Sequence, residues 1–190
     1  MTNILTRTTE LVKLFWNEYI DNGSVAVDMT VGNGCDTVYL SEHCGKVYGF
    51  DIQEKAISNT KEKLSKDNVE LICDSHENVK KYVKEEVDLL VFNLGYLPHG
   101  NENITTHKES TLKAIRESLD ILKVNGLLSI VIYWGHEEGK KEREGIKEFV
   151  NELNSHYYHV AYMSFPNQDK CPPEIILVTK RKKDEENEEK

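Results

Sequence analysis

Apolar segments rich in β-branched residues alternate with amphipathic segments along most of this chain. The apolar runs predict strands at residues 25–29, 47–51, 69–73, 87–93 and 127–133. The amphipathic segments predict helices at residues 8–19, 36–43, 54–66, 76–83 and 108–122. Strands and helices that alternate in this way form a mostly parallel sheet with right-handed crossovers and helices on both faces.

The C-terminal third departs from this alternation. After a predicted helix around 142–154 come two strand-like runs, 157–165 and 174–180, with only residues 166–173 between them. A parallel connection needs a dozen or more residues, so these two strands should pair antiparallel. A mostly parallel sheet that ends in an antiparallel hairpin is typical of the methyltransferase variant of the doubly wound fold. The predicted architecture is therefore a Rossmann-like class I methyltransferase α/β domain with seven strands.

Length and composition bound the remaining possibilities. The 190 residues suffice for one domain, predicted at 1–183, followed by an acidic tail at 184–190 that is expected to be disordered. The apolar runs are far shorter than the roughly 18 residues of a membrane span, and the N-terminus has no secretion signal, so a cytoplasmic location is expected. Four scattered cysteines without a Cys-x-x-Cys pair predict neither a disulfide framework nor a thiolate metal site.

A formal net charge of −9 argues against an extended nucleic-acid-binding surface, because phosphate contacts dominate such binding. Two local basic runs stand out, residues 180–183 and the group Lys140, Lys141 and Arg143. Interspersed charges of this kind are commonly just a solvated face.

The first predicted strand runs into a glycine-rich turn that leads directly into a helix. Gly32 and Gly34 let the backbone approach a ligand closely, and the helix start offers backbone donors that suit the carboxylate of a methionine moiety. Asp28 at the strand end can orient a ligand ammonium through backbone or water. A dinucleotide fingerprint would place a third glycine where Thr37 stands. NAD is thereby disfavoured, and S-adenosylmethionine (SAM) is the predicted cofactor.

Two further strands also end in acids. Asp51 follows Asp28 at the spacing of a ribose-binding carboxylate, and Asp74 could accept a hydrogen bond from the adenine amino group. An acid after a strand is also a common helix cap or turn former. Three such acids on consecutive strands nevertheless lie where open α/β sheets bind ligands. The predicted cofactor site also includes the residues that follow these acids, Ile52, Gln53, Ser75 and His76, together with Asn93 at the end of the next strand.

The fourth strand ends in Asn93-Leu94-Gly95-Tyr96, which is similar to the Asn-Pro-Pro-Tyr motif of amino-methylating enzymes. In that motif the carboxamide oxygen and the next backbone carbonyl accept hydrogen bonds from the substrate nitrogen, and the tyrosine packs against the base. The catalytic prediction is therefore Asn93, Leu94 and Tyr96. Here Leu94 and Gly95 replace the prolines. The other interpretation is a turn with Tyr96 in the core. His136, in a predicted covering loop at 133–139, is assigned a positioning role.

The motifs together resemble one family, the small bacterial proteins named putative rRNA methylases, which includes a tRNA wobble-uridine methyltransferase. The resemblance lies in residues 28–37, 93–98, 133–136, 165–168 and 172–173. It implies that Asn33, Asp36 and Thr37 join the cofactor site. It also implies a substrate, the aminomethyl group of 5-aminomethyl-2-thiouridine in tRNA, which is converted to methylaminomethyl, and it favours a homodimer.

Three hypotheses follow. The first is a SAM-dependent N-methyltransferase of the tRNA wobble uridine, and the second is a methyltransferase of rRNA or of a small amine. The third is a SAM-binding module without catalysis. For tRNA, the expected contact surface combines Arg7 and Lys13 with residues 180–183.

Overall fold

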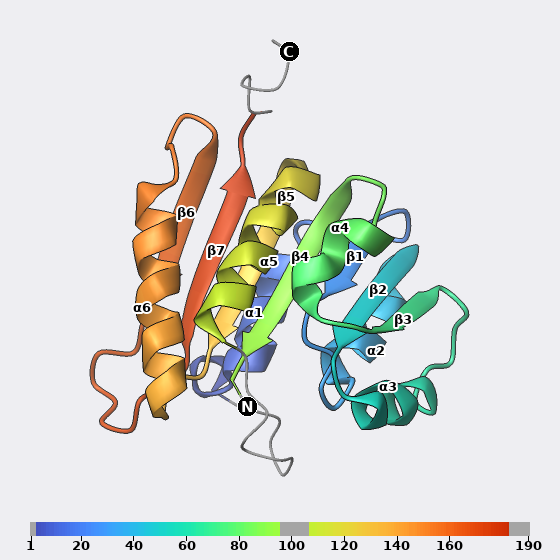
Figure 1. Ribbon diagram of the computed structural model, residues 1–190, viewed down its shortest axis with the longest axis horizontal. Helices are drawn as coiled ribbons and strands as arrows, with labels where there is room; N and C mark the ends of the chain where they lie inside the picture. Colours follow the sequence, from blue (N-terminus) through green and yellow to red (C-terminus); the bar gives the residue numbers. More distant parts are fainter. Residues whose placement is uncertain (1–2, 96–106, 183–190) are drawn as a thin grey trace.

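The computed structural model describes residues 3–95 and 107–182. Seven strands form one sheet in the order β3-β2-β1-β4-β5-β7-β6 (Figure 1). The strands are β1 (Val25–Asp28), β2 (Lys46–Asp51), β3 (Val69–Cys73), β4 (Val87–Leu94), β5 (Leu122–Ile132), β6 (Tyr158–Met163) and β7 (Glu174–Lys180).

Strands β1 to β5 run parallel to their neighbours, whereas β7 pairs antiparallel with both β5 and β6. The predicted seven-stranded, mostly parallel sheet with a C-terminal antiparallel hairpin is therefore confirmed. The reversal at β7 follows from the short connection after β6, which is too short for a crossover.

Helices cover both faces of this sheet (Figure 1). Helices α4, α5 and α6 lie on the near face, and α1 and α2 pack on the other. Their bounds are α1 (Thr8–Trp16), α2 (Cys35–His43), α3 (Glu54–Lys61), α4 (Val79–Tyr82), α5 (Lys108–Ile121) and α6 (Glu137–Glu152), with short 3-10 helices at Ile4–Thr6 and His76–Asn78.

The central strands are buried on both sides because each face carries a helical layer. In β4, Leu90 and Phe92 point into the cluster beneath α5, while Leu89 and Val91 point into the cluster beneath α1. Successive side chains of a strand face opposite ways, so a strand buried on both faces is a continuous apolar run. This explains why the sequence of β4 is apolar almost throughout.

The ends of several elements differ from the sequence prediction. Helix α6 begins at Glu137, so the segment predicted as a loop over 133–139 is partly helical, with Glu137 and Glu138 in its first turn. Acids are favoured there by the helix dipole, which accounts for their presence without a role in binding. The helix predicted at 76–83 is divided into the 3-10 turn and α4, and α3 ends before residue 66. The predicted tail 184–190 lies outside the described residues.

One ion pair ties α6 to the reversed strand. The guanidinium of Arg143 donates to both carboxylate oxygens of Glu174, each at 2.6 Å, and it stacks on the ring of Trp134. Glu174 is only 4% exposed, so its charge depends on this bidentate partner.

Replacement of Glu174 by glutamine should lower the free energy of unfolding by about 2 kcal/mol, because a charge-assisted pair becomes a neutral one in a buried place. Urea denaturation at neutral pH measures this change. The matched control is Glu138→Gln, which breaks the pair with Lys141 at 2.8 Å between half-exposed side chains and should cost much less, because solvent screens an exposed pair. Equal losses in both variants would contradict the prediction.

Candidate active site

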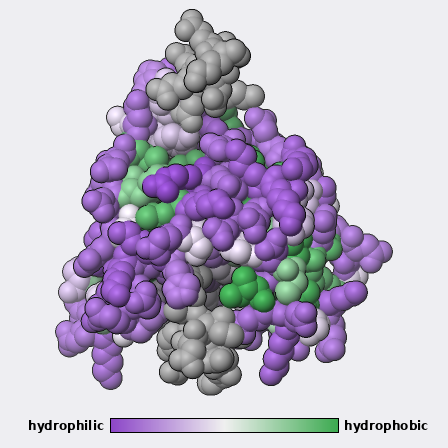
Figure 2. Space-filling model, viewed as in Figure 1, coloured by the Kyte–Doolittle hydropathy of each residue, from purple (hydrophilic) through white to green (hydrophobic). Residues whose placement is uncertain are grey.

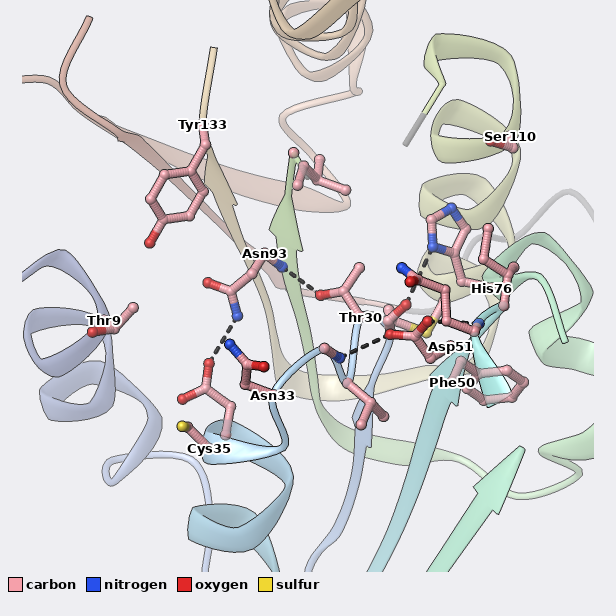
Figure 3. A pocket seen from close by; sticks show the side chains of 18 of the residues that line it. Thr9, Thr30, Asn33, Cys35, Phe50, Asp51, His76, Asn93, Ser110 and Tyr133 are labelled. Atoms are coloured by element: carbon pink, nitrogen blue, oxygen red, sulfur yellow. Dashed lines mark hydrogen bonds between the residues drawn. The ribbon is translucent and has the colours of Figure 1, made fainter. Parts of the chain in front are cut away.

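A cavity of about 1250 Å³ opens at the carboxyl ends of the parallel strands. It is larger than the roughly 300–1000 Å³ of common small-molecule sites, so it has room for a cofactor and for part of a second reactant. Figure 3 shows Asn93, Asp51 and His76 around it, with Thr9 and Tyr133 at one side. The predicted site residues that line it are Gly32, Asn33, Asp36, Asp51, Ile52, Gln53, Ser75, His76, Asn93, Leu94 and His136.

Asp28 does not line the cavity but lies behind the loop that does. It is fully buried, and its two oxygens accept hydrogen bonds from the backbone N–H of Thr30 at 3.1 Å and from the hydroxyl of Thr37 at 2.6 Å. The first bond holds the turn after β1 and the second holds α2. Gly34, whose φ of 76° suits glycine, lies between Thr30 and Thr37 in the chain and is not one of the residues that line the cavity.

Burial raises the pKa of the Asp28 carboxyl to about 7, and the nearby charge of Asp36 adds to this effect. The hydrogen bonds from Thr37 and Thr30 act in the opposite direction. Asp28 therefore carries an energetic cost at neutral pH, since its charged form is poorly solvated.

Asp51 stands at the end of β2 and faces the cavity. Its Oδ2 accepts from the backbone N–H of Gly32 at 2.8 Å, and its Oδ1 accepts from that of Gln53 at 2.9 Å (Figure 3). Each carboxylate oxygen keeps a further lone pair for a ligand hydroxyl. Beside it, Ile52 lines the cavity and is 58% exposed, which leaves an apolar surface open to a planar ring.

Asp74 is not brought to the cavity. Its oxygens accept from the hydroxyl of Tyr82 at 2.7 Å, the amide of Asn78 at 3.0 Å and the N–H of Ser75 at 2.7 Å. The Tyr82 hydroxyl is the main reason that the pKa of Asp74 is lowered. His76 does line the cavity, and burial lowers its pKa, so its ring is neutral at neutral pH.

Asn93 lies at the centre of the cavity wall, in β4. Its backbone N–H donates to the hydroxyl of Thr30 at 2.7 Å, and its side-chain amide donates to Asp36 Oδ2 at 2.8 Å (Figure 3). The carboxamide oxygen is buried and has no hydrogen-bond partner among the described residues. A buried acceptor without a partner is costly, and a ligand in the cavity that donates a hydrogen bond would satisfy it.

Of the remaining residues of the predicted catalytic motif, the structure describes Leu94 and Gly95. The carbonyl of Leu94 already accepts from the backbone N–H of Tyr133 at 2.9 Å, and Tyr96 lies outside the described residues. The backbone turns at Gly95, where φ is 144° and an added Cβ would lie 3.1 Å from Tyr133. His136 lines the cavity as the residue before α6.

Residues from α1 and α5 were not predicted at the cavity. Thr9, Glu10 and Lys13 reach it from α1, and Ser110 reaches it from α5. An amphipathic pattern shows which helix face is apolar but not which end of a sheet the polar face overhangs, so the sequence carries no signal for these residues.

Two residues of the expected basic surface, Lys180 and Lys13, make contacts elsewhere, whereas Arg7, Arg181 and Lys182 are exposed. Lys180 is 6% exposed and donates to the carbonyl of Leu119 at 2.8 Å. Lys13 lies in the cavity wall. Lys140, Lys141 and Arg143 each pair with an acid. On the face shown in Figure 2 the surface is largely hydrophilic, but many of the lysines of α4 to α6 are neutralised in this way.

The strand order with its reversed β7, together with a ligand cavity at the carboxyl ends of the strands, defines a class I methyltransferase fold. The sequence profile of the family described as "Putative rRNA methylase" matches residues 47–179. This chain belongs to that family, as the motifs predict.

Relatives of known structure agree with this assignment. A putative methyltransferase from Streptococcus mutans, solved in complex with SAH, is 39% identical with a TM-score of 0.86, covering 95% of this chain and 99% of that one. A putative rRNA methylase from Clostridium thermocellum is 36% identical with a TM-score of 0.87, covering 95% and 98%.

A curated relative, the chloroplastic tRNA (mnm(5)s(2)U34)-methyltransferase of Arabidopsis thaliana, is 37% identical in an alignment 164 positions long that covers 77% of this chain and 60% of the relative. The chain spans 60% to 65% of the length of the curated relatives it matches.

Two absences hold for residues 3–95 and 107–182. No helix there is both long and apolar enough to cross a membrane. In the same ranges, no group of three or more His, Cys, Asp or Glu side chains is placed to hold a metal ion.

The raised pKa of Asp28 predicts a pH-dependent stability. Because the pKa rises from 3.8 to about 7 on folding, the carboxyl's contribution is fully present below pH 3.8 and is lost as the pH rises through 7. Between pH 5 and pH 8 this amounts to roughly 3 kcal/mol. Urea denaturation should show that Asp28→Asn removes most of that drop. Asp74→Asn, whose parent pKa is lowered, should keep it; an unchanged pH dependence in Asp28→Asn would contradict the assignment.

Proposed function

We propose that this chain is a SAM-dependent N-methyltransferase that acts on the aminomethyl group of 5-aminomethyl-2-thiouridine at the tRNA wobble position and gives the methylaminomethyl form. The observation that carries the proposal is the carboxamide oxygen of Asn93: the residue lines the cavity, and this oxygen is buried and has no hydrogen-bond partner among the described residues. An acceptor in that position suits a ligand that donates N–H, such as an amine.

The cavity fits SAM. Asp51 would accept from the ribose hydroxyls, and the exposed side chain of Ile52 would pack against the adenine. Val38 N–H makes the first i to i−4 bond of α2, to Gly34, so the preceding N–H groups are available for the methionine carboxylate. When bound, SAM would supply a methyl group on a positively charged sulfur. The relative solved with SAH, S-adenosyl-L-homocysteine, supports this choice.

The chain's own residues would position the amine. An aliphatic amine must be neutral to react, and a hydrogen bond to Asn93 Oδ1 from one of its hydrogens directs the lone pair away from that oxygen. Transfer between two well-placed groups needs chiefly proximity and alignment.

The assignment of an RNA substrate is supported by the names of related proteins. The curated relative's name specifies a tRNA wobble-uridine methyltransferase, while the family description specifies rRNA. The aminomethyl group is an aliphatic amine that can donate N–H to Asn93, and unmodified RNA bases carry no such group, so the wobble nucleoside is the substrate that we choose. A cytoplasmic location and a homodimer stay predictions; β6, one of the two edge strands of the sheet, is where a second copy would pair.

The substrate can be tested with tRNA and rRNA from cells that lack this gene. The protein and SAM should convert the aminomethyl nucleoside of that tRNA to its methylaminomethyl form, as measured by mass spectrometry of nucleoside digests. Methylation of rRNA with an unchanged tRNA would favour the second hypothesis. Saturable SAM binding without any methyl transfer would favour a binding module.

Replacement of Asn93 by alanine should reduce kcat for the tRNA at least about 100-fold, because the amine loses the acceptor that aligns it. The dissociation constant for SAH should change less than about threefold, since the proposed cofactor contacts at Asp51 and α2 remain. Single-turnover kinetics and calorimetric titration measure the two quantities. Asn151→Ala, on the exposed face of α6, is the matched control and should retain full activity. Normal turnover in Asn93→Ala would refute the catalytic assignment.

A further inference from the structure

The two ends of the Asn93 side chain have different hydrogen-bonding capacities, so the orientation of the carboxamide decides what the cavity offers a ligand. Its nitrogen lies 2.8 Å from Asp36 Oδ2. An ionised carboxylate can only accept, so it must face the NH₂ group. The flipped carboxamide would place two acceptors against each other with no hydrogen between them. A charged Asp36 therefore holds the NH₂ group of Asn93 and leaves the carboxamide oxygen turned away from Asp36.

The charge of Asp36 has its own support. Lys13 Nζ lies 3.5 Å from Asp36 Oδ1, and it also donates to Glu10 at 3.2 Å. The side chains of Lys13 and Asp36 are 14% and 11% exposed, so solvent screens their attraction weakly. Burial raises the pKa of Asp36, and the charge of Lys13 followed by the amide of Asn93 opposes that shift.

Three elements meet in this arrangement. Lys13 belongs to α1, Asp36 to the first turn of α2 and Asn93 to β4. Lys13 is held over the ring of Tyr39 at 4.8 Å, which restricts its position. Glu10 and Lys13 also line the cavity, so the chain of contacts runs along its wall rather than through the core.

We propose that Lys13 and Asp36 are positioning residues that act through Asn93: they hold its carboxamide so that only an acceptor faces the substrate. The inference rests on the proposed function and deepens it, because it names the chemical selection at the site. A reacting nitrogen that carries a hydrogen to donate is accepted, whereas a carbonyl oxygen or a ring nitrogen with only a lone pair is rejected.

Asp36→Asn is the decisive variant, because an asparagine at 36 can pair with either end of the Asn93 amide and so permits the flip. With the aminomethyl tRNA as substrate, kcat should fall about 10-fold or more, while the dissociation constant for SAH changes less than about threefold. The opposite split, weaker SAH binding with an unchanged kcat at saturating SAM, would show that Asp36 is a cofactor ligand and would overturn the proposal.

Lys13 is tested by a matched pair. Lys13→Met should lower kcat, and Lys13→Arg, which keeps the charge, should restore most of it. Lys80→Met removes the same kind of side chain from an exposed pair with Asp120 and should leave kcat unchanged. Equal activity of Lys13→Met and wild type would overturn the part of the proposal that concerns Lys13.

A double-mutant cycle separates action through Asn93 from a merely structural role. In the Asn93→Ala background, Asp36→Asn should cause no further loss of kcat, whereas independent effects would multiply and contradict the proposal. A readout without activity is the hydrogen exchange of the Asn93 side-chain amide in the SAH complex. It should be slow in the wild type and fast in Asp36→Asn; fast exchange in both overturns the inference. A wild type that is inactive on the tRNA but shows the slow exchange would contradict only the proposed function.

Discussion

The burial of one carboxylate, that of Asp28, organises the carboxyl edge of the sheet. Its oxygens bind the backbone of Thr30 and the hydroxyl of Thr37, and these bonds fix the turn between β1 and α2. This turn is also bonded to the two neighbouring strands: the Thr30 hydroxyl accepts from the backbone N–H of Asn93 in β4, and the Gly32 N–H donates to Asp51 in β2. A single buried acid thus sets the relative positions of three strand ends. Burial of the charged Asp28 carboxylate lowers the stability of the fold, as strained or destabilising groups at functional sites commonly do.

The chemical character of the site depends on the hydrogen-bond acceptors that this network leaves for a ligand. The oxygens of Asp28 and Asp74 accept hydrogen bonds from protein groups, and neither residue lines the cavity. Asp51 and Asn93 do line it, and each has acceptor capacity that the described residues do not use. These two remaining acceptors are of different types. A carboxylate suits a diol such as ribose, and a neutral carboxamide oxygen accepts from an amine without holding it as a cation. The division matches a cofactor at β1 and β2 and a substrate nitrogen at β4.

Charge illustrates how far sequence arguments reach. The net charge of −9 argues against an extended basic surface, and in the described part of the chain most surface lysines near α4 to α6 do pair with acids. Which lysines are accessible was not predictable. Lys180 is buried against α5, and Lys13 pairs with Asp36 in the cavity wall. These positions depend on how the helices and strands pack relative to the sheet edge. The composition determines the net charge of the chain, but it does not determine which charged side chains form ion pairs with each other.

The sequence alone determined the order of strands and helices, the antiparallel end of the sheet and the glycine turn after Asp28. These features depend on local periodicity and on connection length, which are written in consecutive residues. It also placed Asp51 and Asn93 at strand ends, since parallel strands present their carboxyl ends at one edge. Only the tertiary structure decided that Asp74 turns away, that Lys13 and Asp36 meet Asn93, and that the carboxamide oxygen is left without a partner in the described chain. Side-chain direction and contacts between distant segments depend on packing, which no local pattern specifies.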